Sequence, residues 1–506
     1  MQAARARKGP RGERTQRSPA QASLREAMAR FSPRPACRVL AVVASLALLG
    51  CSRAPVSAPT AVAEAGEWRF DVTGDAAANE LTVEAWFPPG TPSTLDVESG
   101  SERFVSEARL ATKNGWRDLS VSADGVRAPE CAADGCRIRY RFRLGEAART
   151  VNDVDTAAAT GGAIEAPPST WLLHPNDATP RAYRLHVAPA LPFLSPLPRS
   201  ADGAYEVRGS GLDVAPFAGL GGAWTTRTTT VGGATLTIGI APGSHALDDD
   251  AIVTWIAQAA EGVAAYYGRF PAKSPLFLVI PGRGTSIDGK TLGGGGESIV
   301  FGLGSAVTPA IARESWVATH EMIHMNFPSF GYPHSWLEEG IATYVEPIIR
   351  ARAGIIAPES MWHDLLDQGP QGLAQAGDEG LERTHTWGRT YWGGALFCLV
   401  ADVTIRERTK NARSFDDVLR AVVASGATVA NDWDIARLLD VGDAATGVPV
   451  LHELHARLAL APGAIDLPGL WKQLGVSLHG ASVTYDDRAP LADIRRAITA
   501  RPPTLR

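Results

Sequence analysis

The sequence predicts an α+β protein of several domains: an N-terminal β-sandwich, then a mainly helical domain with a small mixed sheet, and helices at the C-terminus. Three observations predict this class. The chain has 506 residues, which is too long for a single hydrophobic core. Apolar and polar residues alternate in short segments up to about residue 242. Helical spacing of apolar residues dominates from about residue 309 onwards.

The composition is that of an ordinary globular protein, with 45% hydrophobic and 20% charged residues. The formal net charge is -5, and no long basic run follows the N-terminal segment. The electrostatic footprint of a nucleic-acid-binding protein is therefore absent from the sequence. The oligomeric state is left open by these numbers.

Residues 1–51 are typical of a bacterial lipoprotein signal peptide rather than of a folded domain. Two arginines precede an apolar run at 39–49, which is too short to span a bilayer but suits a secretory signal. The run ends in Leu-Leu-Gly-Cys, which resembles a lipobox and implies cleavage before Cys51 and lipidation of its thiol. The alternative is a plain signal peptide with an accidental cysteine. Both Met1 and Met28 fit as the start of the chain.

Residues 52–66 are rich in Ala, Pro and Ser and are typical of a tether. Together with the leader, they predict an exported protein held by its lipid at a periplasm-facing or outer membrane. Cys131 and Cys136 flank an Asp-Gly turn signal and could close a small hairpin disulfide in an oxidising compartment. The alternative, a pair of metal ligands, lacks a second pair that would complete a site.

We expect three structured regions after the tether. The β-sandwich spans 67–242 and includes the alternating segments 136–144, with arginines on one face, and 234–240. The mainly helical domain with its small sheet spans 243–440. A C-terminal helical region, 441–506, completes the chain.

His320, Glu321 and His324 form an HExxH motif within a segment free of Pro and Gly, where a helix is expected. Residues four apart share one face of a helix, so both imidazoles can bind one zinc ion. Glu321 would lie beside them as a general base, acting on a water whose pKa zinc lowers to around 7. The alternative is a surface helix with two unrelated histidines.

A third metal ligand is expected where two glutamates follow one another, after an intervening spacer of fourteen residues. Ser335 and Glu338 have the spacing of a capping box, which would give Glu338 a structural role. Glu339 is then free to bind metal. Two histidines and one glutamate leave the fourth position of zinc open, as a catalytic site requires.

HExxH followed by Trp-Leu-Glu-Glu-Gly-Ile-Ala-Thr-Tyr at 336–344 resembles the gluzincin metallopeptidases. The chain is most similar to the glycyl aminopeptidase family and, more distantly, to the aminopeptidase N type. The resemblance covers roughly 245–440 well and the N-terminal β-region loosely. It implies a thermolysin-like second domain, a Zn²⁺ cofactor, a peptide or protein substrate, and Glu339 as the third ligand.

The resemblance also implies roles for residues outside the metal set. Tyr391, which precedes a Gly-Gly pair, would stabilise the tetrahedral intermediate, because a phenol can donate a hydrogen bond to an oxyanion. The alternative is a core aromatic residue. Gly295, Gly296 and Glu297 resemble a Gly-rich edge strand that binds the substrate backbone and ends in a glutamate for the free amine. The alternative is a Gly-rich turn with an exposed glutamate.

The chain departs from its relatives in three ways: the spacer before Glu339 is short, Trp392 replaces the usual basic residue after the tyrosine, and no PDZ signature is present. These departures leave exo- and endopeptidase activity open, with an aminopeptidase favoured. Two other functions also stay open, a non-catalytic envelope lipoprotein that binds peptides and a hydrolase of a non-peptide amide. His334 and His385 could line the cleft, although loop or packing positions are simpler. Arg389 could bind a substrate carboxylate, although a surface position is simpler.

Overall fold

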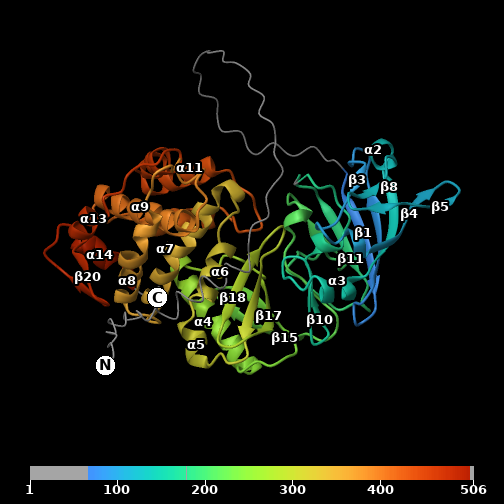
Figure 1. Ribbon diagram of the computed structural model, residues 1–506, viewed down its shortest axis with the longest axis horizontal. Coiled ribbons are helices and arrows are strands. Elements are labelled where there is room, and N and C mark those ends of the chain that lie inside the picture. The colour runs from blue at the N-terminus through green and yellow to red at the C-terminus, as the bar shows by residue number, and fades with distance from the viewer. Residues whose placement is uncertain (1–65, 178, 502–506) are drawn as a thin grey trace, which may run out of the picture. The chain divides into compact units, whose positions relative to one another are not determined.

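The computed structural model describes residues 66–177 and 179–501, all of which fall within one compact unit (Figure 1). The predicted signal peptide, with Cys51, and nearly the whole predicted tether lie outside the described residues. Several sheets and many helices confirm the α+β class. In the part of the chain that the structure describes, no helix is both long and apolar enough to cross a bilayer.

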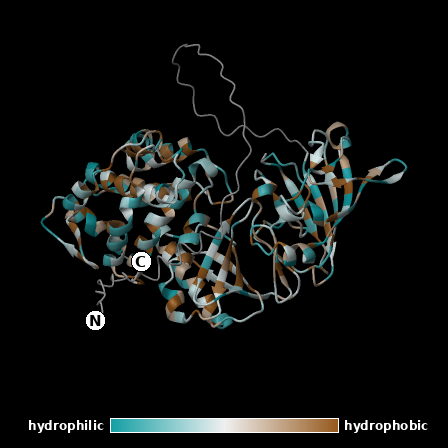
Figure 2. Ribbon diagram, in the orientation of Figure 1, coloured by the Kyte–Doolittle hydropathy of each residue, from teal (hydrophilic) through white to brown (hydrophobic). Residues whose placement is uncertain are grey.

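The N-terminal part is built on a seven-stranded sheet with one buried and one exposed face. In spatial order its strands are β13 (Tyr205–Val207), β11 (Tyr183–Val187), β1 (Trp68–Gly74), β2 (Leu81–Phe87), β8 (Cys136–Phe142), β4 (Val105–Thr112) and β5 (Gly115–Asp118). Buried apolar and exposed arginine side chains alternate along β8, as predicted. Hydrophobic (brown) and hydrophilic (teal) residues alternate in the same way along the strands of this sheet in Figure 2. On the exposed face, Arg139 pairs with Glu84 of the neighbouring strand at 2.8 Å.

Smaller elements share one hydrophobic cluster with the large sheet. They are a three-stranded sheet of β3 (Thr94–Leu95), β7 (Gly125–Arg127) and β6 (Val121–Ser122), a four-stranded sheet of β12 (Phe193–Leu194), β14 (Gly219–Leu220), β10 (Ala163–Glu165) and β9 (Ala158–Thr160), the helices α2 (Glu130–Ala133) and α3 (Leu144–Thr150), and the short 3-10 turns η1 (Glu102–Phe104), η2 (Pro168–Thr170) and η3 (Leu212–Val214). Cys131 and Cys136 form a disulfide. The bridge joins α2 to the start of β8, so the expected hairpin is wrong.

A five-stranded sheet follows the N-terminal part in the chain. Its order is β15 (Thr225–Val231), β16 (Ala234–Ile240), β17 (Leu276–Gly282), β19 (Ser298–Gly304) and β18 (Ile287–Leu292), and β18 is its antiparallel edge strand. The prediction that 234–240 belongs to the β-sandwich is wrong, because this strand pairs in parallel with β17. The alternation of residues identifies a strand but not the sheet in which it pairs.

The two faces of this sheet pack against different parts of the chain. Helices α4 (Asp249–Tyr267) and α6 (Val317–Met325) share one hydrophobic cluster with one face. On the other face, Leu278 and Val300 pack with Phe217 of the N-terminal part. Strand β18 and helix α6 are therefore neighbours, which brings the edge of the sheet to the HExxH motif.

The remaining elements are mostly helices, with one hairpin of β20 (Val476–His479) and β21 (Ser482–Tyr485). The helices and helical turns are α5 (Pro309–Glu314), η4 (Tyr332–His334), α7 (Ser335–Ala353), α8 (Pro358–Gln368), η5 (Gly369–Gly372), the π-helix η6 (Gly388–Gly393), α9 (Gly394–Arg408), α10 (Phe415–Ala424), α11 (Ile435–Thr446), α12 (Val450–Leu454), the π-helix η7 (His455–Ala459), α13 (Leu467–Leu474) and α14 (Ala492–Thr499). The region 441–506 is thus not purely helical. Its apolar residues join the same core cluster as α6 and α7.

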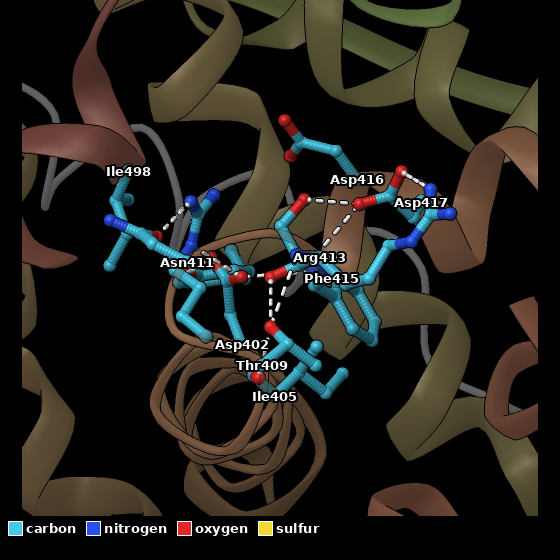
Figure 3. A network of polar contacts seen from close by, with 12 residues as sticks. Asp402, Ile405, Thr409, Asn411, Arg413, Phe415, Asp416, Asp417 and Ile498 are labelled. Carbon is cyan, nitrogen blue, oxygen red and sulfur yellow. Dashed lines mark hydrogen bonds and ion pairs between the residues drawn. The ribbon is translucent and has the colours of Figure 1, made fainter. Parts of the chain in front are cut away.

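A buried polar network links α7, α9, α10 and α14 (Figure 3). Asp402 of α9 accepts a hydrogen bond of 2.9 Å from the backbone N–H of Phe415. Arg352 of α7 pairs with Asp416 at 2.7 Å and donates a hydrogen bond of 2.7 Å to the backbone carbonyl of Ile498. The C-terminal helix is therefore fastened directly to α7, the helix that carries Glu339.

Candidate metal centre

Two consecutive helices carry the predicted metal ligands. Helix α6 places His320 and His324 one turn apart, and the His320 residue is only 6% exposed. Helix α7 packs against α6 and carries Glu339 in its second turn. The structure therefore brings together the three residues that the motif and its spacing single out.

The three ligand atoms form a nearly regular triangle. The Nε2 atoms of His320 and His324 lie 3.2 Å apart, and Oε2 of Glu339 lies 3.3 and 3.4 Å from them. Ligands at the usual zinc bond lengths in a tetrahedron would be separated by roughly 3.3–3.4 Å. Among the described residues, this is the one group of three or more such side chains close enough to hold an ion. The set fits zinc.

The charges of this set complement one another. Burial alone would lower the pKa of His324, but the Glu339 carboxylate raises it to about 9. Burial would raise the pKa of Glu339, yet the two histidines hold it well below its usual range. Two turns further along α7, the buried Glu346 pairs with Arg350 at 2.8 Å and interacts electrostatically with His320. Such carboxylates behind a ligating histidine support its orientation.

The predicted capping box at the start of α7 is wrong. His334 occupies the N-cap position without a side-chain cap, and Ser335 is already the first helical residue. Glu338 does have a structural role, but with other partners. Its Oε1 accepts hydrogen bonds from the backbone N–H of Phe330, at 2.6 Å, and from the hydroxyl of Ser329, at 3.3 Å. It thereby holds the loop between α6 and α7.

Glu321 is buried and lies directly against strand β18. The hydroxyl of Thr291 lies 2.8 Å from Oε2 of Glu321 and 3.0 Å from its backbone carbonyl oxygen. A side chain at Gly289 would place its Cβ 2.6 Å from Cγ of Glu321. Neither Gly289 nor Thr291 is singled out by the sequence patterns.

Tyr391 lies in the π-helix η6, close enough to the Glu339 carboxylate to interact with it electrostatically. Burial, followed by the charges of Glu339 and Glu321, raises the pKa of the phenol well above its usual value. The hydroxyl therefore stays protonated and is available as a hydrogen-bond donor. Trp387 stacks on the ring, with 5.9 Å between ring centroids. Single π-turns of this kind are frequent at functional sites.

Gly295, Gly296 and Glu297 form the turn between β18 and β19, so the expectation of a Gly-rich edge strand is wrong. Gly295 has a φ of +90°, and a Cβ there would lie 2.6 Å from Val207 of the N-terminal part. Close packing therefore requires a glycine at that position. Oε1 of Glu297 accepts a hydrogen bond of 2.7 Å from the hydroxyl of Thr428. The substrate-binding role of these three residues stays a prediction.

The three other residues that could line a cleft have different surroundings. Arg389 is buried and pairs with Asp378 at 2.7 Å, so it supports the structure around the π-helix. His334 lies 2.7 Å from a carboxylate oxygen of Glu382. The ring of His385 lies tilted against that of an exposed tyrosine, with 5.6 Å between ring centroids.

A buried carboxylate that no sequence pattern indicates lies at the end of β10. Glu165 is 1% exposed, and neither of its carboxylate oxygens has a hydrogen-bond partner among the described residues. Burial, followed by the charges of Asp155 and Asp153, raises its pKa well above the usual value, against the opposing charge of Lys290. Lys290 lies on β18 and forms an ion pair with Asp155.

No protein-family model matches the chain, and neither does any curated protein. Among solved structures, an M1 zinc metallopeptidase from Deinococcus radiodurans is 14% identical, with 79% of this chain and 94% of that chain covered and a TM-score of 0.48. An aminopeptidase N family protein from Idiomarina loihiensis is also 14% identical, with 81% and 78% covered and a TM-score of 0.55. The latter likeness shows that the chain shares the fold of that aminopeptidase N family protein.

Proposed function

We propose that this protein is a zinc-dependent peptidase whose metal ion is held by His320, His324 and Glu339. The observation that carries the proposal is the triangle of ligand atoms, with edges of 3.2 to 3.4 Å. A buried glutamate and a protonated phenol stand beside it, as hydrolysis of an amide requires. The likeness to the fold of an aminopeptidase N family protein supports the same conclusion.

The zinc ion would supply a water of lowered pKa, around 7, and would polarise the substrate carbonyl. Glu321 takes the proton of the attacking water and delivers it to the leaving nitrogen. Tyr391 donates a hydrogen bond to the carbonyl oxygen as that oxygen becomes negative. Strand β18 is the edge of its sheet, the position at which an extended peptide would add as a further strand.

Within this class we favour an aminopeptidase that acts on peptides in the bacterial envelope. The fold likeness and the acidic side chain of Glu297 support recognition of a free amine. The lipobox-like sequence before Cys51 supports export and a lipid anchor. Release of N-terminal residues from short peptides, with internally quenched peptides left intact, is the result expected of an aminopeptidase. Loss of the protein from the membrane fraction in Cys51→Ala is the result expected of a lipid anchor.

The test of the chemistry combines metal analysis with cleavage assays on residues 52–506. We expect one zinc ion per chain and cleavage that a chelator abolishes. Glu321→Gln should keep the zinc and lose turnover, whereas Glu261→Gln, an exposed position on α4, should change neither. A chain without zinc and without cleavage would contradict the proposal. Turnover of Glu321→Gln at the wild-type rate would contradict the role of the base.

A further inference from the structure

Strand β18 touches the proposed catalytic base at two positions. Gly289 and Thr291 are two residues apart, so they face the same side of the strand, toward α6. Lys290 lies between them and faces the opposite side, where it pairs with Asp155 of the N-terminal part. This alternation fixes which side chains of the strand can reach Glu321.

The Thr291 hydroxyl carries one proton and has two oxygen atoms of Glu321 within reach. The carboxylate oxygen Oε2, at 2.8 Å, is closer than the backbone carbonyl oxygen, at 3.0 Å. A hydrogen bond from a hydroxyl to a charged carboxylate is also about twice as strong as one between neutral groups. We therefore assign the proton to Oε2.

A hydrogen bond to one carboxylate oxygen determines how the other oxygen is directed. The last torsion of a glutamate side chain has broad minima, so an unsupported carboxylate turns easily. With Oε2 held by Thr291 and Cγ packed against the backbone of Gly289, the carboxylate plane has little freedom left. Oε1 is then the oxygen that can accept the proton of the attacking water.

We propose that Thr291 is a positioning residue for Glu321, which holds the carboxylate of the base in the orientation for proton transfer. The inference rests on the proposed function, because it assumes that Glu321 is the base. Thr291 does not touch the reacting atoms in this scheme. Its effect should therefore appear in kcat and leave metal binding unchanged.

The test compares Thr291→Val with Thr291→Ser in the zinc-loaded enzyme. Valine keeps the shape and removes the donor, and serine keeps the donor and removes the methyl group. We expect Thr291→Val to lower kcat roughly ten- to a hundredfold, the range for a lost hydrogen bond to a charged group. KM and zinc content should stay near the wild-type values, and Thr291→Ser should recover most of kcat. Thr228→Val, an exposed position on the opposite edge strand β15, is the matched control.

The other possible outcomes contradict either the role of Thr291 or the role of Glu321. Wild-type kcat in Thr291→Val would show that the hydroxyl does not orient the base. A serine variant as impaired as the valine variant, or loss of zinc in the valine variant, would assign Thr291 a packing role only. If Glu321→Gln is inactive while Thr291→Val is fully active, the inference fails and the proposed function stands. If Glu321→Gln keeps its turnover, Glu321 is not the base and the inference fails with it, whereas absence of zinc and of cleavage in the wild-type chain would overturn the proposed function.

Discussion

At Gly289, strand β18 lies so close to the proposed base that there is no room for a side chain, and Gly289→Ala tests whether this approach is needed. The new Cβ would lie 2.6 Å from Cγ of Glu321 and 2.8 Å from Cγ1 of Val317. Contacting carbon atoms normally lie about 3.5–4.0 Å apart, so each distance must open by about 1 Å. Strand β18 is paired with β19 and α6 carries two of the proposed zinc ligands, so the side chain of Glu321 must move. A misplacement of about 1 Å can cost about a hundredfold in rate.

The assay is kcat on a peptide that the wild-type enzyme cleaves, measured beside zinc content and thermal unfolding. We expect Gly289→Ala to keep its zinc and to lose about a hundredfold in kcat. Gly302→Ala is the control, because that glycine lies on β19 and a Cβ there has no neighbour closer than 3.7 Å. A folded, zinc-loaded Gly289→Ala enzyme with kcat within about threefold of wild type would refute the reasoning.

Four further predictions follow from the same structure. Tyr391→Phe should lower kcat roughly a hundredfold or more with zinc retained, since one donor to the oxyanion is lost; unchanged kcat would refute that role. Glu339→Gln should lose zinc on dialysis, and a full complement of metal would contradict its place among the ligands. The pKa of Glu165 is higher in the folded than in the unfolded chain, so the free energy of unfolding should fall as pH rises through the folded pKa. In urea titrations at several pH values, Glu165→Gln should weaken the pH dependence of the free energy of unfolding. An unchanged pH dependence would show that Glu165 does not cause the fall. Replacing both Cys131 and Cys136 by alanine should lower the free energy of unfolding by about 2 kcal/mol, because the closed loop is short, and equal stability would contradict a formed disulfide.

The metal set could be predicted from the sequence because its geometry is local. The helical period alone places His320 and His324 on one face, one turn apart. The choice of Glu339 over Glu338 rests on the family resemblance and on a capping box that the structure does not contain. Glu338 nevertheless has a structural role, because its carboxylate accepts hydrogen bonds from the loop at 329–330. The prediction of its structural role therefore rested on the wrong partner.

The side of the site that strand β18 forms could not be predicted, because it depends on which strands and helices pack together. Alternation within 287–292 gives two faces but does not say that α6 covers one of them. The Gly-rich turn shows the same limit. Its glycines suggested contact with a substrate, whereas a Cβ at Gly295 is excluded by Val207, which is distant in sequence. Glu165, buried by the fold and without a hydrogen-bond partner among the described residues, carries no local signal at all.

Buried ion pairs hold the elements that carry the site. Arg389 and Asp378 pair beside the π-helix of Tyr391, while Arg350 binds Glu346 on the ligand helix α7. Pairs of this kind contribute little net stability, because the cost of removing charges from water offsets their attraction. Breaking one by removal of a single partner nevertheless costs about 3–5 kcal/mol. Their consequence here is geometrical: Arg389 ties the π-helix of Tyr391 to Asp378, and Arg350 holds the Glu346 carboxylate that interacts with His320. The precision of the metal centre therefore depends on charges that never reach the substrate.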